Sequence, residues 1–248
     1  MKKSEQIKQI AEQLKLPVLI DYQVHIKPTE PFEEKLLTIL EIQLAQKEQQ
    51  RMERRIKRAK FPYIKTLDTF VFDSERLPNL KEEDVRELAK CDFIKQKRNV
   101  IAVGNPGTGK SHICISLGMK AIQNNINVLF KKAADLVNEM SRAQHEKELD
   151  KYLKKLHKFP ILIIDEMGYL SFNTKDSSLL FQIIAQRYET RSTIITTNLH
   201  FSEWSDFLQD KKLITAIVDR LSHKTIFLNM FGESWRAMEA ESFMNNSS

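Results

Sequence analysis

The sequence contains few of the residues that crosslink a chain or place it in a membrane. It has two cysteines among 248 residues, Cys91 and Cys114, which lie far apart and show no metal-type spacing. We therefore expect free, buried thiols rather than a disulfide framework or a zinc site. No apolar run approaches the roughly 18 residues that a membrane span requires, and the basic start at Met1 lacks the apolar core of a signal peptide. These absences predict a soluble, cytoplasmic protein with no membrane partner.

Glycine is also scarce, yet three of the six glycines fall within one eight-residue segment. The segment fits the phosphate-binding pattern G-x-x-x-x-G-K-[ST], and its residues are Gly104, Asn105, Pro106, Gly107, Thr108, Gly109, Lys110 and Ser111, with His112 next. Glycines let successive backbone N–H groups point at phosphate oxygens, and a following helix adds a partial positive charge. Lys110 can reach the β- and γ-phosphates, and the Ser111 hydroxyl can bind Mg²⁺. A β-rich run before the segment and helical apolar spacing after it favour a nucleotide site over a plain turn.

A second run is an apolar strand that ends in two carboxylates, Asp165 and Glu166. Asp165 would hold Mg²⁺, and Glu166 would polarise the water that attacks the γ-phosphate. An ordinary strand whose carboxylates cap the next turn would explain this run alone. Its pairing with the phosphate loop favours ATP hydrolysis over binding without turnover.

Three further polar residues complete the predicted site. Asn198 ends a β-branched run at residues 192–198, and it could orient the attacking water from a neighbouring strand. Arg220 and Arg236 could each neutralise γ-phosphate charge, one of them from a neighbouring subunit. From the residues alone, a surface or salt-bridged role is the simpler interpretation of either arginine.

Positive charge is concentrated near the start of the chain. Residues 1–65 hold fourteen Lys and Arg against nine Asp and Glu, which is +5 of the total net charge of +6. The candidates for contact with DNA phosphates are Arg51, Arg54, Arg55, Lys57, Arg58 and Lys60. Charge alone favours a solvated helix face as the explanation of this run.

The order of the expected elements indicates two domains. A short amphipathic helix and a long helix from Pro31 to about Lys60 predict a small helical domain over residues 1–65. Leucines in the first half of the long helix indicate core packing or a partner helix. Over residues 66–248, strands are expected at 99–103, 128–130, 161–166, 192–198 and 224–229, with helices between them and a helix at 82–97 before them. This alternation predicts an α/β domain with a parallel sheet flanked by helices.

Together these motifs resemble the AAA+ ATPases and, within them, the IstB-like group related to the DnaC helicase loaders. The more specific matches lie at residues 165–170, 201–204 and 232–236. The resemblance implies ATP and Mg²⁺ as cofactors. It assigns Lys110 and Ser111 to Walker A, Asp165 and Glu166 to Walker B, Asn198 to sensor 1, Arg220 to the arginine finger and Arg236 to sensor 2. With about a dozen residues after Arg236, we expect no C-terminal helical lid.

The resemblance also implies a function and partners. Such proteins oligomerise on double-stranded DNA through ATP-bridged interfaces and direct a cognate transposase, which makes the basic N-terminal segment a candidate DNA contact. A DnaC-like loader of a replicative helicase is the alternative; it would prefer single strands, whose bases usually stack on aromatic side chains. The run from Lys47 to Lys60 contains no aromatic residue and favours a duplex. A small-molecule P-loop kinase is a further alternative, against which Glu166 and a trans-acting Arg220 both argue. A non-hydrolysing nucleotide switch is another, in which Glu166→Gln would change nothing.

Overall fold

The computed structural model describes residues 3–27, 29, 31–169, 172–204, 211–235, 237 and 238. Contacts within it divide the chain into two compact units, residues 1–54 and residues 55–248. The domain boundary expected at residue 65 stays a prediction. None of the helices in the described part of the chain is long and apolar enough to cross a membrane.

The first unit is helical. Its elements are α1 (Lys3–Leu14), two short 3-10 helices (Pro17–Leu19 and Tyr22–Val24) and the larger part of α2 (Phe32–Ala59). The long helix expected from Pro31 is thereby confirmed, because Pro31 immediately precedes it. Within this unit, α2 buries Ile39 and Gln43, and the Gln43 amide oxygen accepts a hydrogen bond of 3.4 Å from the backbone N–H of Val18.

The second unit is built on a five-stranded parallel sheet with the strand order β2-β3-β4-β1-β5. The strands are β1 (Asn99–Val103), β2 (Val128–Lys132), β3 (Ile161–Met167), β4 (Ser192–Thr197) and β5 (Thr225–Asn229). The central strands are continuous apolar or β-branched runs because helices cover both of their faces. The predicted α/β fold with a parallel sheet is confirmed.

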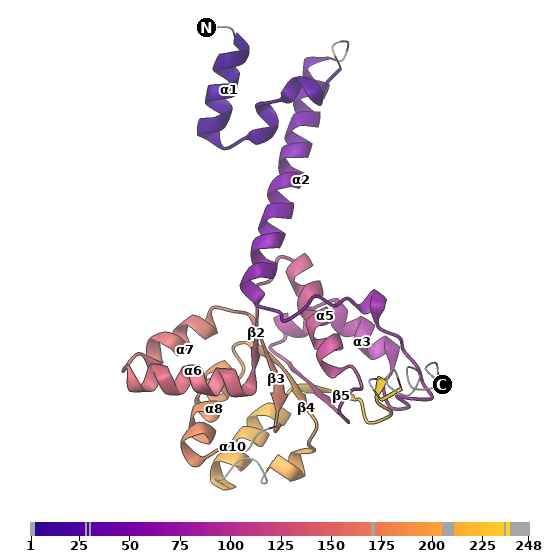
Figure 1. The fold of residues 1–248 in the computed structure, drawn as a ribbon, viewed down its shortest axis with the longest axis vertical. Helices are drawn as coiled ribbons and strands as arrows, with labels where there is room; N and C mark the ends of the chain where they lie inside the picture. Colours follow the sequence, from indigo (N-terminus) through magenta and orange to yellow (C-terminus); the bar gives the residue numbers. More distant parts are fainter. Residues whose placement is uncertain are drawn as a thin grey trace, which may run out of the picture. The chain divides into compact units, whose positions relative to one another are not determined.

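Helices occupy both faces of this sheet, as Figure 1 shows. On one face lie α6 (Ala133–His145), α7 (Leu149–His157), α8 (Thr174–Arg187) and α10 (Lys211–Ser222). On the other lie α3 (Glu82–Ala89) and α5 (Lys110–Gln123), and the short α4 (Asp92–Lys95) leads into β1. An apolar core joins the first face to the sheet, and the fully buried Trp204 belongs to it.

One expectation needs correction. The helix expected over residues 82–97 is two helices, because Cys91 adopts a left-handed conformation (φ 67°) between α3 and α4. The amphipathic helix α7, rich in lysine, buries Leu153 and Leu156. The expectation for the cysteines is confirmed, since Cys91 and Cys114 are both free and buried.

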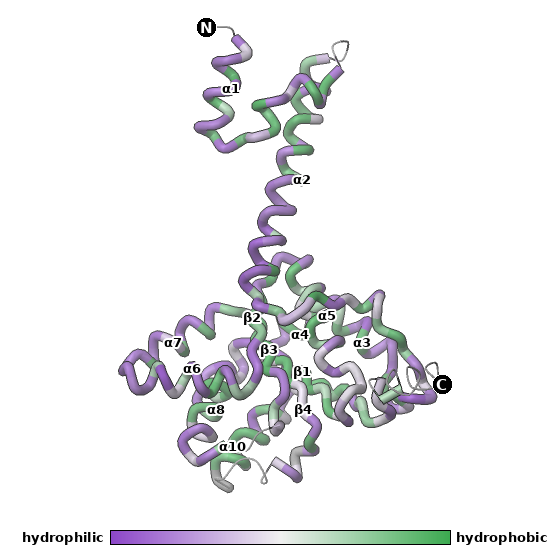
Figure 2. The backbone as a smooth tube through the Cα atoms, in the orientation of Figure 1, coloured by the Kyte–Doolittle hydropathy of each residue, from purple (hydrophilic) through white to green (hydrophobic). Residues whose placement is uncertain are grey.

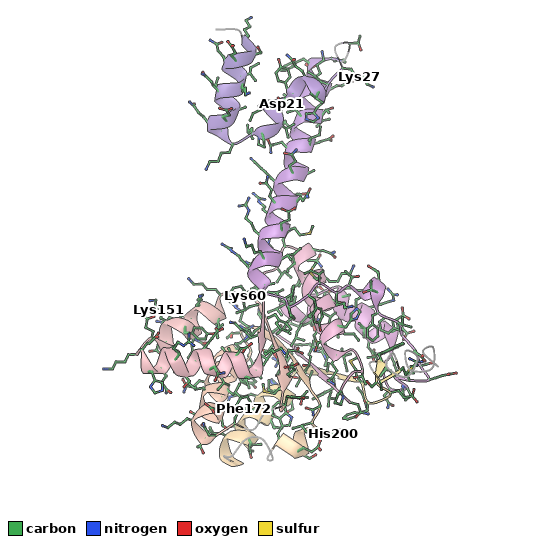
Figure 3. All side chains as sticks on the ribbon, in the orientation of Figure 1. Asp21, Lys27, Lys60, Lys151, Phe172 and His200 are labelled. Atoms are coloured by element: carbon green, nitrogen blue, oxygen red, sulfur yellow. The ribbon has the colours of Figure 1, made fainter. Side chains whose placement is uncertain are left out.

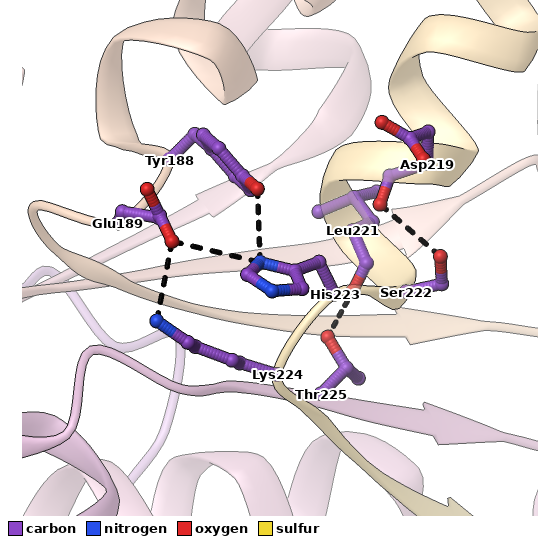
Figure 4. A network of polar contacts seen from close by, with 8 residues as sticks. All are labelled: Tyr188, Glu189, Asp219, Leu221, Ser222, His223, Lys224 and Thr225. Carbon is purple, nitrogen blue, oxygen red and sulfur yellow. Dashed lines mark hydrogen bonds and ion pairs between the residues drawn. The ribbon is translucent and has the colours of Figure 1, made fainter.

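A polar network ties together the amino-terminal edge of the sheet (Figure 4). The Tyr188 hydroxyl lies 2.9 Å from Nδ1 of His223, and Lys224 Nζ lies 3.1 Å from the Glu189 carboxylate. These contacts join the end of α8 to the turn between α10 and β5. The phosphate loop and the carboxylates of β3 follow the opposite ends of their strands, so the network lies away from the candidate site.

Candidate functional site

The phosphate loop lies between β1 and α5, as the motif requires. Gly107 (φ 81°) and Gly109 (φ 91°) adopt backbone conformations that other residues rarely take, and α5 begins at Lys110. The hydroxyl of the fully buried Thr108 donates a 2.8 Å hydrogen bond to the Asn105 carbonyl and closes the loop on itself. The first turn of α5 therefore presents its free N–H groups at the loop, where an anion binds best.

Close backbone packing explains the glycines. A Cβ on Gly104 would lie 2.0 Å from the Met230 carbonyl oxygen, and one on Gly107 would lie 2.0 Å from Ser234 Oγ. The segment after β5 is thus packed against the loop. Two further hydrogen bonds hold it there: Asn105 Nδ2 donates to the Gly232 carbonyl at 2.9 Å, and Trp235 N donates to the Gly107 carbonyl at 3.1 Å.

Lys110 lies over the loop. Its ammonium group donates hydrogen bonds of 2.7 Å to the carbonyl oxygens of Gly104 and Asn105. These carbonyls hold the ammonium group at the point where phosphate oxygens would enter.

Two side chains from two different elements, α5 and β4, converge on Asp165 near the end of β3. Ser111 Oγ donates to Asp165 Oδ1 at 2.7 Å, and Thr196 Oγ1 donates to the same oxygen at 2.5 Å. Thr196 also accepts a 2.9 Å hydrogen bond from the backbone N–H of Glu166. The Asp165 carboxylate is 4% exposed, so this threonine both satisfies a buried charge and fixes the backbone beside it.

Glu166 leaves the regular strand geometry. Its φ is 61°, and the pairing of β3 with β4 shifts register between Ile164 and Met167. The bulge turns its half-exposed side chain toward Lys132, the last residue of β2, whose Nζ lies 3.0 Å from Oε2 and 3.2 Å from Oε1. The hydrogen bond with Glu166 is the main reason that the pKa of Lys132 is raised.

A cavity of about 540 Å³ opens over these groups. The predicted residues that line it are Pro106, Gly107, Gly109, Lys110, Ser111, His112, Glu166 and Asn198. Gly104, Asn105, Thr108 and Asp165 lie directly beside it through the hydrogen bonds described above. The structure therefore brings the Walker residues and Asn198 to one place, although β4 ends at Thr197 and Asn198 is the first residue after it.

One wall of the cavity comes from the irregular segment between α2 and α3, residues 60–81, which we call the connector. The sequence motifs did not predict that this segment belongs to the site. This wall comprises Tyr63, Lys65, Thr69, Phe70 and Val71, and Tyr169, Thr196, Thr197 and Trp235 complete the lining. Of these residues, Thr196 carried a usable signal, because a threonine late in the strand next to the Asp165 strand can reach that carboxylate.

His112 fastens the connector to α5. Its Nε2 lies 2.9 Å from the Thr66 carbonyl oxygen and 3.2 Å from Thr69 Oγ1, and the Phe70 ring packs edge-on against the imidazole with centroids 5.2 Å apart. Burial is the largest cause of the lowered pKa of His112; Lys65 lowers it further, and the hydrogen bond with Thr66 opposes them. A neutral imidazole is thus the form that the connector holds.

Of the two predicted arginines, Arg220 is among the described residues. Arg220 lies on α10, donates a 2.9 Å hydrogen bond to the Ala216 carbonyl and stacks over the Phe181 ring at 4.9 Å. It does not line the cavity of its own chain. Arg236 lies outside the described residues.

The predicted DNA-contacting residues lie at the C-terminal end of α2. Arg51, Arg54, Lys57, Arg58 and Lys60 are exposed, and Arg55 is half-buried. Arg54 Nε donates to the Gln50 carbonyl at 3.2 Å. Figure 2 shows the hydrophilic colour of this part of the helix, and Figure 3 labels Lys60 where the helix ends.

The phosphate loop follows β1, Asp165 and Glu166 lie at the end of β3, and Asn198 follows β4. On a parallel sheet flanked by helices, this arrangement defines the P-loop nucleotide-binding fold of the AAA+ class. The chain belongs to the family of IstB-like ATP binding proteins, whose model matches residues 11–242. The family resemblance read from the motifs is thereby confirmed.

Relatives from insertion sequences align over most of the chain. It is 42% identical over 208 residues to the ATP-binding protein of insertion sequence IS5376 from Geobacillus stearothermophilus, covering 84% of this chain and 82% of that protein. It is 41% identical to the IS21 protein from Pseudomonas aeruginosa, covering 77% and 71%. The IS232 protein from Bacillus thuringiensis subsp. berliner is 34% identical, with 93% and 90% covered.

Solved structures support the fold. The replication initiator DnaA bound to AMPPCP and single-stranded DNA matches with a TM-score of 0.55 at 20% identity, covering 66% of this chain and 49% of that one. The DnaC helicase loader matches with a TM-score of 0.53 at 21% identity, covering 66% and 96%. At these identities the likeness shows a shared fold and nothing further.

Proposed function

We propose that this protein is an ATP-dependent helper of transposition that oligomerises on double-stranded target DNA, recruits or regulates a transposase, and hydrolyses ATP to ADP. The observation that carries the enzymatic part is the convergence of Ser111 and Thr196 on Asp165, with Glu166 next to it at the mouth of the cavity. The family of the chain and the names of its insertion-sequence relatives support the biological part.

Each residue has a distinct task in hydrolysis. Lys110 and the N–H groups of the loop neutralise β- and γ-phosphate charge. Glu166 accepts a proton from the attacking water, and Asn198 orients that water from the neighbouring strand end. The Ser111 hydroxyl and the Asp165 carboxylate are hard oxygen ligands, which suits Mg²⁺; the ion would add Lewis-acid stabilisation of the phosphate charge.

The connector wall fits a purine base. Tyr63, Phe70, Val71 and Trp235 give the cavity aromatic and apolar surface beside the phosphate loop, since Phe70 lies against Gly109 and Trp235 N donates to the Gly107 carbonyl. Arg76 stacks over the Trp235 ring at 4.5 Å and holds that ring in place. A nucleoside triphosphate would therefore lie with its base against these side chains and its phosphates on the loop.

Contacts with DNA and with neighbouring subunits are assigned to basic residues that do not line the cavity. Arg51, Arg54, Arg55 and Arg58 follow the spacing i, i+3, i+4 and i+7 on α2, which places them on one helix face. A row of guanidinium groups without aromatic residues suits the phosphates of a duplex. Arg220, which is absent from the cavity lining of its own chain, is assigned to the ATP of a neighbouring subunit.

The test compares ATP hydrolysis with and without duplex DNA. We expect turnover that duplex DNA stimulates and single strands stimulate less, together with DNA binding that weakens steeply as salt rises. Glu166→Gln should bind ATP and lose turnover, whereas Lys110→Ala should lose ATP binding. ATP binding without turnover would contradict the enzymatic assignment. Preferential stimulation by single strands, together with binding to a replicative helicase, would favour the loader alternative.

A further inference from the structure

An apolar stripe of α2 is uncovered within the first unit. Leu36, Leu37, Leu40 and Leu44 are 41%, 57%, 52% and 56% exposed, and Phe32 before them is 72% exposed. At 100° per residue the four leucines fall within about 100° of the helix circumference. The packed side of the helix carries the buried Ile39 and Gln43, so the leucine stripe is a second face.

The described part of this unit buries little apolar surface of its own. Between residues 3 and 54 its buried apolar side chains are Ala11, Val18 and Ile39. More large apolar side chains are exposed on α2 alone than are buried in the whole described unit. Contiguous exposed apolar surface of this kind marks an interaction site in a folded protein.

The charges at the two ends of the stripe indicate the occupant. Glu33 and Lys47 lie on the same face as the leucines, and each is seven residues from Leu40. If two α2 helices pack antiparallel about Leu40, Glu33 of each copy faces Lys47 of the other, and Leu36 faces Leu44. Parallel packing would instead place Glu33 against Glu33 and Lys47 against Lys47. The stripe is therefore complementary to itself in one orientation.

We propose that the leucine stripe of α2 docks on the same stripe of a second copy of this chain, with the two helices antiparallel and Leu40 at the centre. Figure 2 shows the apolar half of α2 giving way to a hydrophilic half beyond this stripe, which limits the interface to the first half of the helix. The contact uses no residue of the nucleotide cavity. It joins subunits in pairs without ATP, in addition to the ATP-bridged contacts of the proposed function.

Disulfide trapping tests the geometry in the full chain without nucleotide. Residue 40 faces itself in the proposed pair, so Leu40→Cys should form a crosslinked dimer on mild oxidation. Phe32→Cys is the control, because the two copies of residue 32 would lie about 24 Å apart along the helix axes, beyond the reach of a disulfide. The native cysteines are buried and should not contribute. Crosslinking of both variants, or of neither, would overturn the proposal.

Sedimentation equilibrium of the full chain without nucleotide tests the energetics. The unaltered chain should dimerise at micromolar concentration, and Leu40→Glu should be monomeric. Val24→Glu, an equivalent change at a residue that is 81% exposed outside α2, should still dimerise. Glu33→Lys and Lys47→Glu should each weaken the dimer about tenfold, because each turns two attractive pairs into repulsive ones.

The double variant Glu33→Lys with Lys47→Glu should restore the dimer, since it re-forms both pairs with reversed sign. A chain that stays monomeric at every concentration, or a double variant that is weaker than both single variants, would refute the interface. Because the measurements need no ATP and no DNA, their failure would leave the proposed ATPase function as it stands.

Discussion

The Lys132 ammonium group pairs with both carboxylate oxygens of Glu166, at 3.0 Å and 3.2 Å. Lys132 is the last residue of β2, and Glu166 is turned toward it by the bulge in β3. Both oxygens of the carboxylate that we propose as the general base are thereby engaged by one ammonium group. An attacking water would gain full access to this carboxylate only when the two side chains separate.

Removing the lysine should release this restraint. We expect Lys132→Met to raise ATP turnover in the absence of DNA by about threefold to tenfold, the effect being modest because both side chains are about half exposed. Stimulation by DNA should shrink accordingly in a steady-state phosphate-release assay. The control is Lys95→Met, which removes a surface ion pair with Asp92. This variant should change turnover neither with DNA nor without it. A loss of turnover in Lys132→Met would contradict a restraining role.

Thr196 is expected to support Asp165 and Glu166 together. Thr196→Val keeps the shape of the side chain but removes the hydrogen bond to Asp165 Oδ1 and the acceptor for the Glu166 N–H. Turnover should fall about tenfold to a hundredfold, which corresponds to about 1–3 kcal/mol for buried groups left unpaired. Thr196→Ser should retain most of the activity because it keeps the hydroxyl. Equal loss in both variants would show that the methyl group, rather than the hydroxyl, is required.

Much of the nucleotide site could be predicted from sequence because its residues occupy fixed positions beside short, strongly apolar strands. The phosphate loop and Asp165 are local patterns, and a parallel sheet brings its strand ends to one edge. The connector wall could not be predicted, because Tyr63 and Phe70 precede β1 in an irregular segment, which His112 holds through Phe70 and the Thr66 carbonyl. Lys132 was likewise missed, since its partner lies 34 residues away and only the β2–β3 register brings them together.

The leucines of α2 illustrate a different limit. Their spacing predicts an apolar helix face, but periodicity alone does not distinguish a face buried within the chain from a face that a partner covers. The structure separates the two, because Ile39 is buried and Leu40 is half exposed on the same helix.

Arg187 should be a main determinant of the stability of the sheet. It is 2% exposed, and its guanidinium donates to Thr193 Oγ1 and to backbone carbonyls of Leu156, Phe159, Pro160 and Ser192. Burial, with a smaller contribution from Arg191, lowers the pKa of Arg187 to about 9, which leaves it charged at neutral pH. Arg187→Lys cannot satisfy so many carbonyls and should cost about 3 kcal/mol or more in the free energy of unfolding measured by denaturant titration.

The half-buried Arg191 provides the control for that measurement. It donates to the His157 and Thr190 carbonyls, so Arg191→Lys should cost about 1 kcal/mol or less. Similar losses in the two variants would contradict a special role for Arg187.

His112 should make the protein less stable in mild acid. Its pKa in the folded protein is lowered from the ordinary value of 6.5, mainly by burial. As pH falls through this value the unfolded chain binds a proton that the folded chain does not, so the free energy of unfolding decreases. His157, whose pKa burial also lowers, contributes in the same direction. We expect His112→Asn to reduce the pH slope of stability, and His145→Asn, at an exposed residue, to leave it unchanged; an unaltered slope in His112→Asn would refute the assignment.

Arg220 should act on the ATP of a neighbouring subunit, and mixing two inactive variants tests this directly. Glu166→Gln lacks the proposed base but keeps Arg220, whereas Arg220→Ala keeps the base but lacks the arginine. Each variant alone should hydrolyse ATP at a small fraction of the normal rate. In an equal mixture, a quarter of the subunit contacts would pair an intact Glu166 with an intact Arg220, so turnover should recover to about a quarter of normal.

The matched control mixes Arg220→Ala with the double variant that lacks both groups. Every intact base in this mixture faces a neighbour without the arginine, so no recovery should occur. Recovery in the first mixture alone would show that the arginine acts in trans, because there each active site combines groups from two chains. The structure favours this result, since Arg220 contacts Phe181 and Ala216 within its own chain and lines no part of its own cavity. Normal turnover in Arg220→Ala alone would reduce the residue to its packing on Phe181, and absence of recovery would place its action within one chain.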